Sequence, residues 1–183
     1  MSWLETTALK RPTAIVAVAS AAIAAAALAA RPGSMTRGHA PVWVETAWRV
    51  PLDNWGQGRA WQSSAGVTML ARTKTGFCNC FGGIANDEEI DRIGDVDLHG
   101  ETFVAAGPGE VVAVGALAGR KRLFQASTRF GGTRQVLSIV AATDCKAVVA
   151  TLVSDGAVTA ETEAAAVVLL RGESFQHWAA NQP

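Results

Sequence analysis

The chain contains no tyrosine, only three cysteines and three histidines, and no excess of charge of either sign. Its 16 basic and 16 acidic residues give a formal net charge of zero. A balanced chain lacks the basic surface by which proteins hold DNA or RNA, so we expect no nucleic acid among its partners. When the apolar N-terminal segment is set aside, roughly 145 residues remain, which suffices for one domain with its own core.

Motifs that would identify a reaction are also missing. The sequence has no C-x-x-C-H, no H-E-x-x-H, no phosphate-binding glycine loop and no G-x-S-x-G. His39 falls in a linker, which leaves His99 and His177 as candidate general bases. A catalytic triad assembled by folding stays open, because triads are defined by geometry. No residue pattern favours an enzyme, and we predict a non-catalytic protein.

The clearest feature that is present is the uncharged run PTAIVAVASAAIAAAALAA, residues 12–30. Its 19 residues suit a membrane-spanning helix, for which about 17 to 25 are needed. The tripeptide Ala27-Leu28-Ala29 also forms the A-x-A cleavage site of a secretory signal peptide. Residues 1–30 are therefore interpreted as a membrane anchor or a signal segment, and both alternatives remain open.

Two properties of this run favour an anchor. It is longer than the roughly 7 to 15 apolar residues of a typical signal core. Eleven of its residues are alanine, and Ala17, Ala21 and Ala25 recur every four positions, as in helices whose backbones approach one another closely. We therefore expect the run to pack against the helices of an integral membrane protein complex.

The charges around the run predict its orientation. Three positive groups, the terminal amine among them, precede it, and Arg31 and Arg37 follow it. The excess on the N-terminal side predicts that the N-terminus is cytoplasmic. The domain would then lie on the periplasmic side of a bacterial-type inner membrane, held by a single span, or would be secreted to the periplasm if the segment is cleaved.

Residues 31–41 are predicted to be a linker, and residues 42–183 an extracytoplasmic α+β domain. Period-two alternation predicts strands at 42–47, one or two strands within 59–73, and further strands after Gly100. Turns are expected at Pro108-Gly109 and at Gly131-Gly132. The sum is a mostly antiparallel meander of about six strands.

Two helices are predicted within this domain. A short one follows the capping residue Asn86, with Glu89 three residues later, and stops at Gly94. A C-terminal helix begins at Thr159 and ends near Gly172, after which a short terminal turn restarts.

The stretch GFCNCFGG carries the most reactive chemistry. Cys78 and Cys80 are separated by one residue, and two nearby thiolates can bind copper or zinc or act as a redox dithiol. In an oxidising compartment, however, Cys145 would form a disulfide with Cys78 or Cys80. We favour the structural disulfide and expect no cofactor, with Cu or Zn at the C-x-C as the alternative.

The stretch DVDLHGE raises a second metal hypothesis. If it is extended, Asp95, Asp97 and His99 share one face and could hold a divalent cation. The same alternation of polar and apolar residues is also expected for an edge strand with one solvent-exposed face. Further along, three basic residues at 120–122 are expected in an exposed turn, solvated or facing anionic head groups.

Four of the six tryptophans lie between residues 43 and 61. Aromatic residues with a polar edge are common at interfaces and at membrane surfaces, and also in cores. We predict a partner or membrane interface at Trp43, Trp48, Trp55 and Trp61. Together with the apolar run, this predicts a non-catalytic accessory subunit of a larger inner-membrane complex. The alternative is a secreted or tethered periplasmic protein that binds thiols or metals through Cys78 and Cys80.

Overall fold

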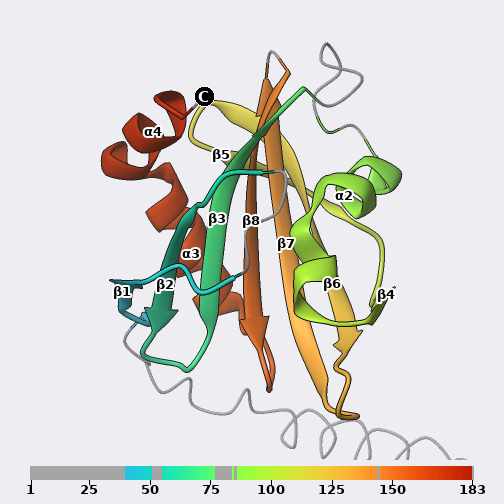
Figure 1. Cartoon of the computed structure of the whole chain (residues 1–183). Coiled ribbons are helices and arrows are strands. Elements are labelled where there is room, and N and C mark those ends of the chain that lie inside the picture. The colour runs from blue at the N-terminus through green and yellow to red at the C-terminus, as the bar shows by residue number, and fades with distance from the viewer. Residues whose placement is uncertain (1–39, 51–54, 77–83, 85, 144, 183) are drawn as a thin grey trace, which may run out of the picture. The chain divides into compact units, whose positions relative to one another are not determined.

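A computed structural model describes residues 40–50, 55–76, 84, 86–143 and 145–182. These residues form one eight-stranded sheet in which every pair of neighbours is antiparallel (Figure 1). The strands are β1 (Trp43–Thr46), β2 (Arg59–Ser63), β3 (Thr68–Thr75), β4 (Thr102–Ala105), β5 (Glu110–Val114), β6 (Leu117–Ser127), β7 (Thr133–Thr143) and β8 (Lys146–Ser154). Their order across the sheet is β1-β2-β3-β8-β7-β6-β4, and β5 also pairs with β6.

The predicted α+β class with a mostly antiparallel sheet is confirmed, although the described strands exceed the expected six. The pairing around the turn at Pro108-Gly109 centres on β6, which is 11 residues long. The turn at Pro108-Gly109 does separate β4 from β5, but those strands do not pair with each other. Instead β5 pairs with the first part of β6 and β4 with its last part, so one long strand supports two short ones.

Three α-helices are described, and the first two begin and end at the capping residues that the sequence predicts. They are α2 (Asp87–Ile93), α3 (Ala160–Arg171) and α4 (Glu173–Ala180). The Asn86 side chain accepts a hydrogen bond from the backbone N–H of Glu89, and the Thr159 side chain accepts one from Thr162. Each cap satisfies a donor that the first helical turn leaves unpaired. Gly172 separates α3 from α4.

The stretch from Asp95 to His99 is a 3-10 helix, η1, so the extended strand predicted there is wrong. In a strand, Asp95 and Val96 would point to opposite faces, one exposed to solvent and one buried. In the structure both are buried. The Asp95 carboxylate is drawn inward because two cations of β3 lie beside it.

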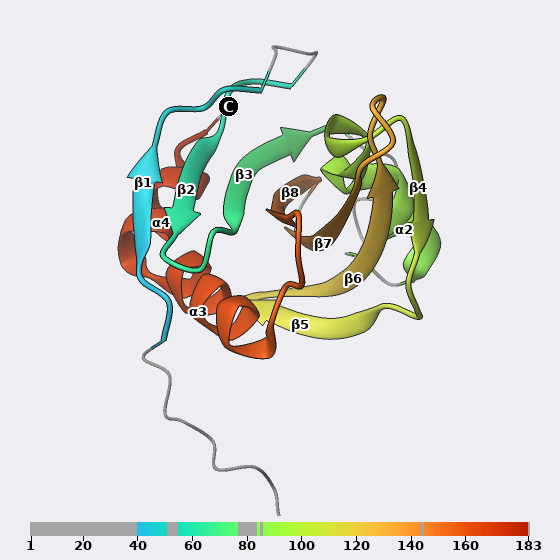
Figure 2. The ribbon, with the colours of Figure 1, turned by 90° about the horizontal axis from the view of Figure 1, so that it is seen from below.

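The helices lie on both faces of the curved sheet (Figure 2). On one face, α3 and α4 cover the largest hydrophobic cluster, which includes Met69, Leu152, Leu170 and Phe175. On the other face, α2 contacts β6 and β7, and η1 contacts β7 and β8. The central strands are therefore buried on both sides, and six of the nine residues of β8 are apolar for this reason.

The basic residues at 120–122 lie within β6 and not in the expected turn. Successive side chains of a strand point to opposite faces, so the outer two residues point toward α2 and the middle one toward α3. Each finds an acidic partner: Arg120 with Asp87, Arg122 with Asp91, and Lys121 with Glu163. These charges join the helices to the sheet from both sides.

The described domain is one compact unit that begins at Ala40. The predicted anchor or signal segment, with Ala17, Ala21 and Ala25, lies outside the described residues, as does nearly all of the predicted linker. Among the helices that are described, none has the length and hydrophobicity needed to cross a bilayer.

Candidate functional site

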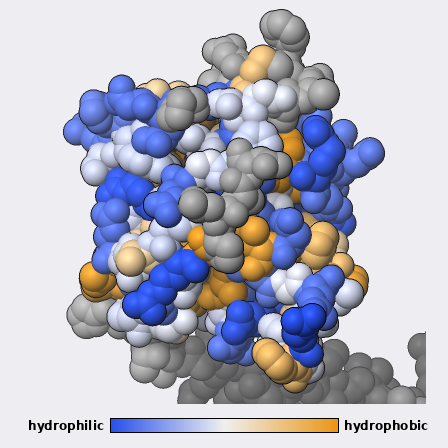
Figure 3. All heavy atoms as spheres, viewed as in Figure 1, coloured by the Kyte–Doolittle hydropathy of each residue, from blue (hydrophilic) through white to orange (hydrophobic). Residues whose placement is uncertain are grey.

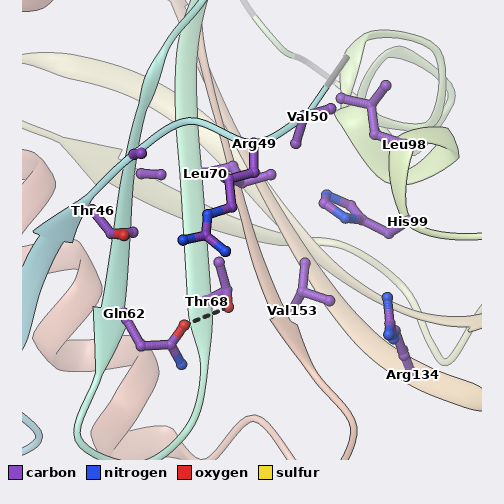
Figure 4. Close-up of a pocket in the computed structure, with 12 residues that line it drawn as sticks. Thr46, Arg49, Val50, Gln62, Thr68, Leu70, Leu98, His99, Arg134 and Val153 are labelled. Carbon is purple, nitrogen blue, oxygen red and sulfur yellow. Dashed lines mark hydrogen bonds between the residues drawn. The ribbon is translucent and has the colours of Figure 1, made fainter.

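A groove opens on the face of the sheet that carries η1, where the helices leave β2 and β3 uncovered (Figure 4). Its volume is about 600 Å³. The segment that follows β1 forms one wall and η1 forms the other. The lining residues that the structure describes are Thr46, Ala47, Arg49, Val50, Ala60, Gln62, Thr68, Leu70, Leu98, His99, Arg134 and Val153.

The groove combines an apolar floor with a polar rim. Leu70 and Val153 come from adjacent strands, and hydrophobic residues are visible in the middle of this face among hydrophilic ones (Figure 3). The Thr68 hydroxyl donates a hydrogen bond of 2.8 Å to the Gln62 side chain. Arg49 and Arg134 supply two positive charges, whereas the described part of the lining contains no acidic residue.

His99 closes the η1 side of the groove as a neutral side chain. Its Nε2 lies 2.9 Å from the hydroxyl of Thr151 on β8. The pKa of His99 is lowered from 6.5 to about 4, mainly by burial; the nearby charge of Arg134 also lowers it, whereas Asp95 and Asp97 oppose the shift. At neutral pH the imidazole therefore takes part in hydrogen bonding without adding charge to the groove.

A buried ion cluster holds η1 in this position. The guanidinium of Arg72 donates two hydrogen bonds of 2.6 Å to the Asp95 carboxylate, and the Lys74 ammonium lies 2.5 Å from it. Lys74 also donates to the carbonyl of Ile93, at the end of α2. Their side chains are between 3% and 9% exposed. At that depth the bidentate geometry is needed to offset the cost of removing the charges from water.

The cluster also reaches the start of the segment before β2. The carbonyl of Trp55 accepts a hydrogen bond of 3.4 Å from Arg72, and the Lys74 ammonium lies 5.4 Å from the centre of the Trp55 ring. Trp55 is half-buried in this contact. Its ring therefore serves the domain itself, in addition to any role at an interface.

The three predicted metal ligands on η1 do not form a metal site. The Asp95 carboxylate is engaged by Arg72 and Lys74, His99 bonds to Thr151, and Asp97 is exposed. In the part of the chain that the structure describes, no group of three or more His, Cys, Asp or Glu side chains is placed to hold a metal ion. The metal hypothesis assumed an extended backbone, in which the three side chains lie on one face. In the 3-10 helix they do not share one face.

Cys145 lies in the turn between β7 and β8 and is disulfide-bonded. Its φ of 66° is the left-handed conformation, which is uncommon for a residue other than glycine. The carbonyl of Cys145 accepts a hydrogen bond from the N–H of Gly76, two residues before Cys78 in the sequence. Cys78 and Cys80 themselves lie outside the described residues, and the pairing of Cys145 with one of them stays a prediction.

The four tryptophans predicted at an interface have different environments. Trp61 is 4% exposed and packs against Phe175 in the core, so it offers no surface to a partner. Trp43 is half-buried, and its indole N–H has no acceptor among the described residues. Trp48 is also half-buried. For these two the interface role remains a prediction.

Strand β1 forms one edge of the sheet. Val42 and Val44 are 65% and 63% exposed, and Glu45 is held by Arg59 of β2 through two hydrogen bonds. The carbonyl of Val42 accepts from Ser64 beyond β2. Because bonding alternates along an antiparallel pair, the backbone groups of Trp43 and Glu45 point away from β2, toward the open edge.

The sequence pointed to His99, as a metal ligand or a general base, and it missed the rest of the groove. Arg49 and Arg134 are isolated charges 85 positions apart, and neither belongs to a recognisable motif. The floor comes from alternate residues of β2, β3 and β8, which have the pattern of ordinary core strands. No sequence signal short of the strand order would have brought these residues together.

Comparison with known proteins assigns no family to this chain. It matches no protein-family model and no curated protein.

The buried ion cluster predicts that replacing Asp95 lowers folding stability far more than replacing Asp97, the other aspartate of η1. Replacing Asp95 by Asn leaves two buried cations without their carboxylate, and we expect this to lower the free energy of unfolding by about 3 kcal/mol or more. Asp97→Asn, an exposed change on the same short helix, should shift it by less than about 0.5 kcal/mol. Urea denaturation of both variants measures this. Equal stability of the two would show that the cluster contributes little.

The lowered pKa of His99 predicts that the folded domain loses stability in mild acid. Its pKa is about 4 in the folded state and 6.5 when the side chain is fully solvated, as in the unfolded chain, so between these values the unfolded chain binds more protons. Protonation of His99 therefore has little effect on folding stability above about pH 6.5, and it lowers that stability as the pH drops toward 4. From pH 7.5 to 5.0 this one group should cost about 2 kcal/mol.

The measurement is urea denaturation at both pH values, with His99→Gln as the control. Glutamine does not titrate, and the other ionisable groups are unchanged. The variant should lose about 2 kcal/mol less than the natural chain between the two pH values. Parallel losses in the two proteins would contradict a neutral, buried His99.

Proposed function

We propose that the protein is a non-catalytic accessory subunit of an integral membrane protein complex. One N-terminal helix would anchor it in a bacterial-type inner membrane, with residues 42–183 on the periplasmic side. The Ala-rich run supports an anchor that packs against other helices. The observation that carries the proposal is the exposed edge of β1, which lies just after that run in the sequence.

An edge strand of this kind is a template for strand addition. Proteins usually protect such edges with charges or prolines, because unpaired backbone groups recruit other chains. Here the one charged side chain of β1, Glu45, is already paired with Arg59, and two valines are exposed. Backbone hydrogen bonds at Trp43 and Glu45 would provide affinity, and the valines would provide specificity.

The proposed occupant of this edge is an extended periplasmic segment of a protein in the same membrane. The 11 residues of the predicted linker, 31–41, reach at most about 40 Å when fully extended. An anchored chain would therefore keep β1 within that distance of the bilayer. A partner that shares the membrane is held at high effective concentration, so even a short added strand can bind stably.

The alternative of a thiol or metal protein has less support. The chain has three cysteines, and Cys145 is disulfide-bonded. A bond within the chain would consume Cys78 or Cys80, which would leave a single thiol where the alternative requires two. An exposed lone thiol is a poorer metal site than a pair.

The first test is the intact mass of the protein purified from native membranes in mild detergent. We expect the mass of residues 1–183 and elution in a large complex, because an anchor is retained. A mass that begins near Ala30, in a small soluble peak, would overturn the anchored subunit and leave a secreted domain.

The β1 edge is tested by Glu45→Pro. Proline removes the outward N–H of residue 45 and is tolerated on edge strands, so the fold should persist while strand addition fails. We expect the partner proteins to be lost from the purified complex. Glu45→Ala is the matched control, because it removes the ion pair with Arg59 but keeps the N–H. It should retain the partners.

Thermal unfolding of both Glu45 variants would establish that each is folded. Two folded variants that retain the partners equally would rule out strand addition at β1. Loss of partners in both would assign the effect to the carboxylate and would also reject strand addition.

A further inference from the structure

We propose that the groove between η1 and the segment after β1 binds a small carboxylate with an apolar body. The carboxylate would lie between Arg49 and Arg134, and the body would lie over Leu70 and Val153. The volume of about 600 Å³ is within the range of small-molecule sites, roughly 300 to 1,000 Å³. This inference does not depend on the proposed membrane partner.

The charge of the lining favours an anion. Arg49 and Arg134 approach the groove from opposite sides, with Val153 between them, and none of the lining residues that the structure describes is acidic (Figure 4). Arg49 forms no ion pair with any residue that the structure describes. Arg134 is paired with Asp155 at 2.8 Å, but that carboxylate is 82% exposed. Such solvent-exposed pairs are weak, so a bound anion can compete for the guanidinium.

The floor favours a ligand that is more than an inorganic anion. Leu70, Val153 and Leu98 present apolar surface that phosphate or sulfate would leave in contact with water. An aromatic or aliphatic body would cover this surface and gain from its burial. The Thr68 hydroxyl donates to the Gln62 side-chain oxygen, and the Nε2 of His99 lies at hydrogen-bonding distance from Thr151. The arginines are therefore the groups best placed to bind a polar end.

The geometry also suits a carboxylate as the charged end. A guanidinium offers paired donors in one plane, which match the two oxygens of a carboxylate. Both arginines are exposed, at the rim and not in the core. Replacing either one should therefore leave the fold intact, so a loss of binding can be assigned to the site.

The experiment is isothermal titration calorimetry of the full chain in mild detergent, with a titration into detergent alone as the blank. The carboxylate probes are benzoate, 4-phenylbutyrate and octanoate. The first control, 4-phenylbutyramide, has the apolar body without the charge. The second control, inorganic phosphate, is charged but has no apolar body. We expect at least one carboxylate to bind with one site per chain. The amide and phosphate should bind at least about tenfold more weakly.

The variants are Arg49→Gln and Arg134→Gln, and each should weaken carboxylate binding by about tenfold. Arg129→Gln is the control, because it removes the same charge from an exposed residue outside the lining. It should bind as the natural chain does. No binding by any of the three carboxylates, equal binding of the amide or phosphate, or equal weakening by Arg129→Gln would overturn the proposal.

Discussion

The bond between Arg72 and Asp95 is the interaction on which the arrangement of this domain depends. Arg72 and Lys74 lie on β3, near the middle of the sheet, and Asp95 begins η1. One carboxylate thereby fixes the junction of α2 and η1 against the strands. The position of η1 in turn places His99 against β8, and His99 and Leu98 form one wall of the groove. A buried charge without this partner would be costly, which gives the junction a single favourable arrangement.

The same local use of charge is visible on β6. Residues 120–122 alternate between the two faces of the strand, and each ion pair attaches a helix on its own side. Here Gly109 donates to Asp87, and this hydrogen bond is the main cause of the lowered pKa of that carboxyl, ahead of Arg120. Balanced net charge in the sequence therefore conceals a structure in which many of the charges act locally. The parts of each sheet face that the helices do not cover are the surfaces left for a functional site.

Two open features result from this packing. Among the described residues, the helices on the η1 face stop short of β2 and β3, which leaves the groove, and the sheet ends at β1, whose outer edge pairs with no other described strand. Val42 and Val44 point to the same face of the sheet as the groove residues Thr46 and Gln62, because they share the pleat. A strand added at β1 would therefore lie beside the groove. The groove and the edge differ in chemistry, since one presents cations and the other presents backbone groups and valines.

Local residues were sufficient to predict the α+β class, the helix caps at Asn86 and Thr159, and the turns at 108–109 and 131–132. These features depend on neighbours within a few positions, so the sequence by itself determined them. The tertiary structure decided the rest. Whether residues 95–99 are extended or helical depends on Arg72, 23 positions from Asp95, and the basic run is a strand because it pairs with β5 and β7. The groove was likewise invisible, because its floor is assembled from β2, β3 and β8, whose adjacency only the folded sheet determines.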